Sequence, residues 1–368
     1  MPILFEPFLG NTLVARGPTN LGLYVFKQSD VARAIVIDSG GDEDAGRKIL
    51  RECERLGVEL AMIINTHSNA DHCGGNAFLS KRTGCSIAAT ELEAAFLSYP
   101  QLEPSFLSGS FPQKALRNKF LMAQPSRANC LLEPPCALTF DKDGRWQLSK
   151  PAQAHGSAAA NAPQGSPINE LQSASTFAPW SAPTSASAII PKNESQSAAQ
   201  GMPCLQIMSL PGHYFSMIGI LTPDNVFFVA DSLAGAPILE KYGLFFLYDI
   251  EAELATLSML ESSEAEWFVP AHAEPTQDIK SLVDINRAKI FEIADVIVSA
   301  VNSEANCAEG ATLENVMAAV FSHYDIVLNA NQYVLVGSTI RSYLFWLCDQ
   351  GKLENAFEHQ RMIFRIKR

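Results

Sequence analysis

The sequence predicts a layered α/β protein, followed by a smaller and mostly helical region. Short apolar runs bounded by Gly, Pro or polar residues alternate with stretches whose apolar residues recur at helical spacing. One run, ELAMIINT, is continuously apolar, as expected for a strand buried on both faces of a sheet. Beyond residue 279, helical spacing dominates until two short strand-like runs near the end of the sequence.

The first 66 residues predict three strands, one helix and a further strand. The runs TLVARG, LGLYVFK and RAIVID are rich in β-branched and aromatic residues, which favours strands. The stretch DEDAGRKILRECERLG begins with acidic residues, carries apolar residues at helical spacing and ends at Gly57, which predicts a helix. The buried strand predicted next runs directly into His67.

Residues 86–99 predict a helix, and ALTFDKDGRWQL, with Asp-Gly in a strand-like context, predicts a hairpin. The composition then changes, because residues 151–202 are dominated by Ala, Ser, Pro, Gln and Asn. Such a segment buries too little apolar surface to offset chain entropy, so we expect a flexible insertion. It interrupts the larger domain between two strands that would otherwise be hairpin neighbours.

The rest of the chain predicts further strands and a helical tail. The stretch CLQIMSLPGHYFSMIGILTPDNVFFVADSLAG predicts three strands, and EWFVPAH predicts another after a helix near residues 251–263. In the tail, two apolar stripes at helical spacing precede KLENAFEHQRMIFRIK, which predicts two short strands around a turn. Helix, helix and β-wing form a winged-helix pattern. We therefore expect one domain at residues 1–278 and a winged-helix-like domain at residues 279–368.

Composition and charge exclude several classes of protein. The formal net charge of −12 argues against a general basic surface for nucleic acid, although Arg361, Arg365, Lys367 and Arg368 form a local basic cluster. No apolar run approaches the roughly 20 residues that span a bilayer, and the first residues lack the pattern of a signal peptide. Eight cysteines at irregular spacings, without a CxxC pair, predict reduced thiols in a cytoplasmic protein.

Histidine and aspartate recur where predicted strands end. The residues concerned are His67, Asp71, His72, His213, Asp231 and His272. Each follows an apolar strand and opens a loop, so one edge of a sheet sandwich would gather all six. They include four of the seven histidines, which is hard to ascribe to chance. Neutral imidazoles with carboxylates suit zinc, iron or manganese. The neighbouring Cys73 is interpreted as a small packed residue.

With these residues in place, the chain resembles the metallo-β-lactamase superfamily, whose hallmark loop reads His-x-His-x-Asp-His. Here the loop is HSNADH, residues 67–72, followed by Gly-Gly-Asn. The later markers correspond to PGH at His213, ADS at Asp231 and PAH at His272, and Asp38 resembles a frequent structural aspartate of the fold. The resemblance covers about residues 5–275 apart from the insertion. The tail resembles one found in a branch that includes β-lactamase-like endoribonucleases and other hydrolases.

The resemblance implies an αββα sandwich with two metal positions, most simply two Zn²⁺ ions, with Fe or Mn as alternatives. The first position would use His67, His213 and Asp231, and the second Asp71, His72, His272 and the shared Asp231. It implies a metal-dependent hydrolase in which hydroxide held between the ions attacks an ester, thioester, lactone or phosphodiester bond. Asp71 would be the catalytic residue that orients the nucleophile and relays its proton. The implied partner is a small-molecule substrate.

Asn69 departs from the hallmark, because it stands where the superfamily has a second histidine. An amide oxygen is a weaker zinc donor than imidazole. Two hypotheses follow: a bystander beside a vacant first position, or a weak ligand that tunes the choice of metal. The YFSMIG stretch after His213 also lacks the Thr and Gly-Ser of thioesterase-like members, which argues against glyoxalase II activity. Tyr214, Phe215 and Phe246 are candidates for lining the pocket.

Two further functional hypotheses stay open from the sequence. His67, His213 and Asp231 also form a two-His-one-carboxylate set, which would suit a mononuclear iron oxygenase similar to the persulfide dioxygenases of this superfamily. Alternatively, the C-terminal domain would bind or process nucleic acid through its basic cluster. The simpler interpretation of that domain is that it packs on the sandwich and closes the site, or that it forms a homo-oligomer.

Overall fold

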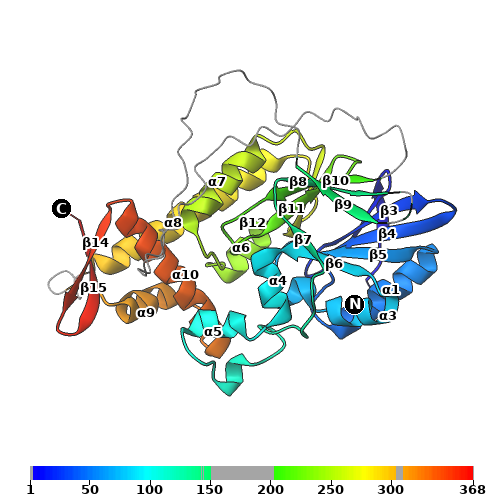
Figure 1. The fold of residues 1–368 in the computed structure, drawn as a ribbon. Coiled ribbons are helices and arrows are strands. Elements are labelled where there is room, and N and C mark those ends of the chain that lie inside the picture. Colours follow the sequence, from blue (N-terminus) through cyan, green and yellow to red (C-terminus); the bar gives the residue numbers. More distant parts are fainter. Residues whose placement is uncertain (1–2, 142, 144, 151–202, 304–309, 368) are drawn as a thin grey trace, which may run out of the picture.

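The computed structural model describes residues 3–141, 143, 145–150, 203–303 and 310–367, so the predicted insertion at 151–202 lies outside the described residues (Figure 1). Two sheets pack face to face, and helices cover their outer faces. This αββα arrangement confirms the predicted fold class.

The first sheet contains seven strands among the described residues, paired in chain order. They are β1 (Glu6–Leu9), β2 (Thr12–Ala15), β3 (Leu21–Gln28), β4 (Val31–Ile37), β5 (Glu59–Ile64), β6 (Ser86–Thr90) and β7 (Cys130–Leu132). The strands β4 to β7 are parallel, whereas β1 to β4 are antiparallel. The outer face carries α1 (Glu43–Leu56), α3 (Asn76–Thr83) and α4 (Glu91–Ser98), whose apolar residues pack with those of the sheet.

The second sheet contains six described strands in the order β13-β12-β11-β10-β8-β9. Their bounds are β8 (Cys136–Phe140), β9 (Trp146–Ser149), β10 (Cys204–Ser209), β11 (Ile218–Leu221), β12 (Val226–Ala234) and β13 (Trp267–His272). Its outer face is covered by α7 (Ile250–Glu261) and α8 (Ile279–Val301). Tyr24, Ile35 and Met62 of the first sheet meet Leu138, Ile207 and Phe228 of the second in the core between the sheets.

The helix predicted after the third strand of the sequence is α1, and both of its ends follow from local chemistry. The Asp42 side chain accepts a hydrogen bond from the Ala45 amide (3.1 Å), which satisfies a free N–H of the first turn. At the other end, Gly57 adopts a φ of 67° and its N–H reaches the carbonyl of Cys53, which ends the helix.

Two predictions about the sheets are wrong. Residues 86–99 are not one helix: Ser86–Thr90 form β6 between β5 and β7, and helix α4 begins only at Glu91. The Ala-rich stretch has no strong strand signal of its own, and its burial between parallel neighbours decides its state. The hairpin β8–β9 is confirmed. The strands on either side of the insertion, β9 and β10, are however not the neighbours that were predicted, because β10 pairs with β8 and leaves β9 as the mostly exposed edge strand.

The C-terminal region extends to the far end of the molecule from β3–β5 (Figure 1). It contains α8, α9 (Leu313–His323), α10 (Ala330–Asp349) and the hairpin β14 (Leu353–Glu358) to β15 (Arg361–Ile366). The hairpin was predicted, and its two turn residues, His359 and Gln360, have φ of 49° and 62°, as a tight two-residue turn requires. The identity of the C-terminal region as a winged-helix-like domain and the domain boundary at residue 278 stay predictions.

One hydrophobic cluster joins the second sheet to the C-terminal helices. It includes Phe227 of β12, Leu257 of α7, Ile290 of α8, Val316 of α9 and Tyr343 of α10. These side chains are fully or almost fully buried, so the helices are docked on the sandwich by apolar contact. No helix among the described residues has both the length and the apolar character to cross a membrane.

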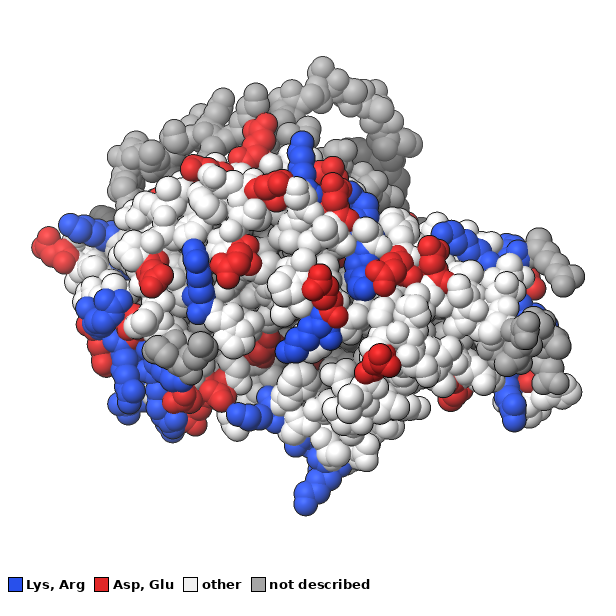
Figure 2. Space-filling model, turned by 180° about the vertical axis from the view of Figure 1, so that it is seen from behind, with Lys and Arg blue, Asp and Glu red and all other residues white. Residues whose placement is uncertain are grey.

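The surface charge of the C-terminal hairpin is partly paired. Arg365 of the predicted basic cluster donates to the Glu358 carboxylate across the hairpin, at 2.7 Å. On the face shown in Figure 2, Lys and Arg side chains are interspersed with Asp and Glu side chains. Binding of nucleic acid by this region stays a prediction.

Candidate metal centre

The candidate ligands lie where strands of both sheets end. Asp38 follows β4, His67 follows β5, and Asp71 and His72 belong to the short helix α2 (Ala70–Cys73). From the second sheet, His213 lies in the β10–β11 loop, Asp231 lies on β12, and His272 ends β13. Because β4 and β5 are parallel, and β12 and β13 are parallel, their carboxyl ends meet at one edge of the sandwich.

An irregularity in β12 accompanies the placement of Asp231. The register between β12 and β13 shifts between Phe228 and Ala230, and Ala230 adopts a positive φ of 50°. A bulge of this kind bends a strand and re-aims the side chains beyond it. Asp231, the next residue, lies among the four histidines.

The Asp231 carboxylate is the centre of the cluster. One oxygen, Oδ1, lies 3.2 Å from His72 Nε2. The other, Oδ2, lies 3.3 Å from His272 Nε2, 3.5 Å from His213 Nε2 and 4.0 Å from His67 Nε2. Asp71 Oδ2 lies 3.5 Å from His272 Nε2 and 3.6 Å from His72 Nε2. All six residues predicted as ligands are therefore brought together.

These atoms form two adjacent groups, each able to hold one cation. The groups are His67, His213 and Asp231, and Asp71, His72 and His272, with ligand atoms within 4.8 Å of one another. The buried Nε2 atoms of His67 and His72 and the Oδ1 atom of Asp231 form no hydrogen bond of suitable geometry in the part of the chain that the structure describes, although His72 Nε2 and Asp231 Oδ1 lie 3.2 Å apart. Buried polar atoms without a partner are costly, and a cation at each group would satisfy them. The donor set thus fits two divalent metal ions.

In three of the four histidines, the Nδ1 atom lies beside an oxygen atom of another residue. The Nδ1 atom of His272 lies 2.7 Å from the Pro18 carbonyl oxygen, which can only accept, so Nδ1 carries the proton. His72 Nδ1 lies 2.8 Å from Asp38 Oδ2, and His67 Nδ1 lies 3.1 Å from Thr66 Oγ1. A proton held on Nδ1 leaves the Nε2 lone pair free for a metal.

In the absence of a metal, the pKa values of the side chains in the cluster are shifted in different directions. Burial lowers the pKa of His67 well below its usual value and also lowers that of His213, so both imidazoles are neutral near pH 7, as a metal requires. The Asp231 carboxylate raises the pKa of His272 to about 11. Burial alone would raise the pKa of Asp231, but the imidazoles of His272, His72 and His213 more than offset this and hold it well below its usual range.

Comparison with known proteins agrees with this arrangement. The sequence model of the metallo-beta-lactamase superfamily matches residues 15–272, which include all six ligand candidates. The chain belongs to the metallo-beta-lactamase superfamily. Two solved structures share its fold with a TM-score of 0.60 and 13% identity. One is a metallo-beta-lactamase family protein from Thermus thermophilus (99% of this chain, 97% of that one), and the other a beta-lactamase domain protein from Burkholderia ambifaria (100% and 95%).

A curated relative is a hydroxyacylglutathione hydrolase from Albidiferax ferrireducens. It is 30% identical over 157 residues, which make up 42% of this chain and 56% of that protein. This superfamily member therefore spans little more than half the length of its curated relative.

The hallmark loop of this superfamily member departs from the pattern at Asn69, and the structure shows what surrounds the substitution. The Oδ1 atom of Asn69 lies 3.3 Å from His213 Nε2, on the side of the first group. Its Nδ2 atom donates to Glu103 Oε1 at 2.9 Å. Glu103 belongs to α5 (Leu102–Ser108) and is 6% exposed. Sequence reasoning missed it, and its one signal is an acidic residue among apolar neighbours.

Two more buried glutamates support the ligand loops, and sequence reasoning missed both. Glu93 of α4 accepts from the Ser68 amide (3.0 Å), the Ser68 hydroxyl (2.6 Å) and the Ser216 amide (3.0 Å), and so ties the loops around His67 and His213 together. Glu253 of α7 lies against Gly212, the residue before His213, and its buried Oε2 atom has no hydrogen-bond partner among the described residues. Burial raises the pKa of both carboxyls.

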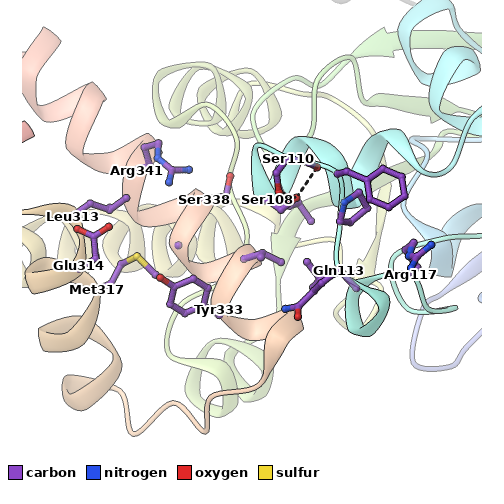
Figure 3. Close-up of a pocket in the computed structure, with 16 residues that line it drawn as sticks. Ser108, Ser110, Gln113, Arg117, Leu313, Glu314, Met317, Tyr333, Ser338 and Arg341 are labelled. Carbon is purple, nitrogen blue, oxygen red and sulfur yellow. Dashed lines mark hydrogen bonds between the residues drawn. The ribbon is translucent and has the colours of Figure 1, made fainter.

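The aromatic residues expected near the site differ in exposure. Tyr214 is completely buried, so it is a core residue. Phe246 is only partly buried, and its ring centre lies 5.5 Å from that of His213. Phe246 also packs against Leu107, Leu116 and Val334. The same three residues line a cavity of about 470 Å³ between α5, the short helix η1 (Lys114–Leu116), α9 and α10, with Tyr333 and Arg341 in its wall (Figure 3). None of the six candidate ligands is among the residues that line this cavity.

Proposed function

We propose that this protein is a metal-dependent hydrolase that holds two divalent cations, with Zn²⁺ as the leading candidate. The observation that carries the proposal is the pair of adjacent three-residue groups around Asp231, in which the buried Nε2 atoms of His67 and His72 lack a hydrogen-bond partner among the described residues. His67, His213 and Asp231 would hold one cation, and Asp71, His72 and His272 the other. Bound there, the cations supply Lewis acidity and lower the pKa of water.

Asp71 is the residue best placed to handle a proton. Its side chain is 48% exposed, more than those of the four histidines and Asp231, and its Oδ2 atom accepts from the Thr19 hydroxyl at 3.0 Å. Burial works against ionisation, but the imidazoles of His72 and His272 outweigh it and hold the pKa of Asp71 below its usual range. An ionised, accessible carboxylate at this place can orient a water molecule by accepting a hydrogen bond from it, and because its pKa is low it would pass on a proton rather than hold it.

Among the four bond types expected from the sequence, we propose a thioester first. The support is the curated relative, whose name describes a hydrolase of hydroxyacylglutathione. The loop after His213 argues for a thioester other than one of glutathione. The hydroxyl of its Ser216 lies 2.7 Å from the Thr90 hydroxyl and donates to Glu93 at 3.4 Å, and its Tyr214 is completely buried, so both side chains are engaged inside the protein rather than available to such a substrate.

The second group of ligands favours this proposal over a mononuclear iron oxygenase. An oxygenase of that kind needs His67, His213 and Asp231 and leaves Asp71, His72 and His272 without a role. The buried, unpartnered Nε2 of His72 belongs to that second group. Oxygen consumption with a persulfide substrate, which such an oxygenase would show, is therefore measured beside the hydrolysis test described next.

The test is elemental analysis followed by a hydrolysis screen. We expect about two equivalents of metal after chelator treatment and reconstitution with Zn²⁺, and turnover of acyl thioesters that needs the metal. Asp231→Asn should lower both, because Asp231 belongs to the first group and lies 3.2 Å from His72 and 3.3 Å from His272 of the second. Asp295→Asn, an exposed change on α8 outside both groups, should lower neither. Protein that retains no zinc, iron or manganese above trace overturns the proposal.

A further inference from the structure

Asn69 is held at both ends of its side-chain amide. Nδ2 donates to Glu103 Oε1 at 2.9 Å, and Oδ1 lies 3.3 Å from His213 Nε2. The NH₂ end of an amide only donates and the oxygen only accepts, so its neighbours decide which end faces which way. An ionised carboxylate only accepts, so in that form Glu103 selects the orientation in which the Asn69 oxygen faces His213.

We propose that Glu103 is a positioning residue that turns the amide oxygen of Asn69 toward the first metal position and makes Asn69 an oxygen ligand there. The proposal rests on the two-metal site of the proposed function. Of the two hypotheses drawn from the sequence for Asn69, it favours the ligand over the bystander, and it adds Glu103 as the residue that orients that ligand. The first position then has two imidazoles, one carboxylate and one amide oxygen.

The surroundings of Glu103 support a dedicated role. Glu103 is 6% exposed, and its side chain bonds to Asn69 alone among the described residues. Glu93, in contrast, accepts several bonds from backbone and hydroxyl groups of two loops, as a structural carboxylate does. Burying a carboxylate for one hydrogen bond is costly, and no Lys or Arg among the described residues pairs with Glu103. Cations in the adjacent centre would supply the missing counter-charge.

The electrostatics agree with this geometry. Burial raises the pKa of Glu103 well above its usual value, and the hydrogen bond from Asn69 opposes that rise. Two divalent cations beside the pair would favour the carboxylate further. Metal binding and the Asn69–Glu103 hydrogen bond should therefore strengthen each other.

The test is a double-mutant cycle on metal affinity, measured without any substrate. The number of Zn²⁺ ions bound and their dissociation constants are determined by competition with a chromophoric chelator for the wild type, E103L, N69A and E103L/N69A. We expect E103L and N69A each to weaken one of the two positions by about 10–100-fold, the range for residues that orient metal ligands. The double variant should be no weaker than N69A alone, because without the amide Glu103 has nothing to orient.

E103Q is the control for a folding defect caused by E103L, since Gln has the shape of Glu and can still accept a hydrogen bond from Asn69 Nδ2. It should weaken the same position less than E103L does. If E103L weakens binding by the same factor with and without Asn69, or if E103L and N69A leave both dissociation constants unchanged, the role of Glu103 is overturned. A wild type that binds no metal overturns the proposed function instead, so the two failures are distinguishable.

Discussion

The Nδ1 atom of His72 lies 2.8 Å from a carboxylate oxygen of Asp38, on the opposite side of the ring from Asp231. The same carboxylate accepts from the amide and the hydroxyl of Thr66, each at 2.8 Å. Asp38 has a φ of 60°, a conformation that Asp tolerates better than most residues. It thus joins the ends of β4 and β5 and sets the orientation of one candidate ligand.

Asp38→Asn tests this relationship, because Asn keeps the shape of Asp and can still accept from the Thr66 amide. Its NH₂ group would face His72 Nδ1 and favour the tautomer protonated on Nε2, which cannot bind a metal. We expect the second position to weaken by about 10–100-fold while the first changes little. Chelator competition measures both constants. Two unchanged constants would show that Asp38 does not set the tautomer.

Asn69→His tests the chemistry of the first position. An imidazole is a softer donor than an amide oxygen, so the variant should prefer Zn²⁺ over Mn²⁺ more strongly than the wild type, by about tenfold. The measurement is competition between the two metals at equal free concentrations, read by elemental analysis. An unchanged ratio would mean that the side chain at this position does not contact the metal.

Gly212→Ala should disturb the loop that carries His213. Gly212 has a φ of 137°, and a Cβ atom there would collide with Glu253 of α7. We expect a loss of at least about 2 kcal/mol in the free energy of unfolding, together with weaker metal binding. Gly84→Ala is the control, since Gly84 has a φ of 72° but open space around its Cβ position. That variant should lose only about 1 kcal/mol, the cost of the backbone conformation, and keep its metal affinity.

Glu52 predicts a pH dependence of stability away from the metal centre. Its carboxylate accepts from Arg55 at 2.8 Å and 3.0 Å and from the Phe5 amide at 3.2 Å. The hydrogen bond from Arg55 is the largest influence and lowers the pKa of Glu52. A carboxyl whose pKa is lower in the folded state stabilises the fold above its unfolded pKa of about 4.3, and this stabilisation is lost as the pH falls through the folded value.

Glu52→Gln should therefore lower the free energy of unfolding by about 1 kcal/mol at pH 7, and the difference from the wild type should shrink below about pH 4. Urea denaturation at a series of pH values measures it. Glu54→Gln, an exposed change on the same helix, is the control and should have little effect at either pH. A difference that stays constant with pH would assign the effect to packing rather than to charge.

Much of the fold could be predicted because its signals are local. The caps of α1 at Asp42 and Gly57 and the tight turn of the last hairpin depend on residues close together in the chain. The state of Ser86–Thr90 could not be predicted, because it depends on β5 and β7 lying on either side. The pairing of β10 with β8 likewise depends on which edge is free when the sheet forms.

The candidate site also has features that the sequence predicts and features that depend on neighbours distant in the chain. The sequence by itself determined the identity and order of the ligand candidates, because a strand that ends in His or Asp is recognisable from its apolar run. Only the tertiary structure decided which groups the side-chain amide of Asn69 meets. Its partner Glu103 lies 34 residues further along the chain on another helix, and the direction of an amide follows from the donor or acceptor it meets in space.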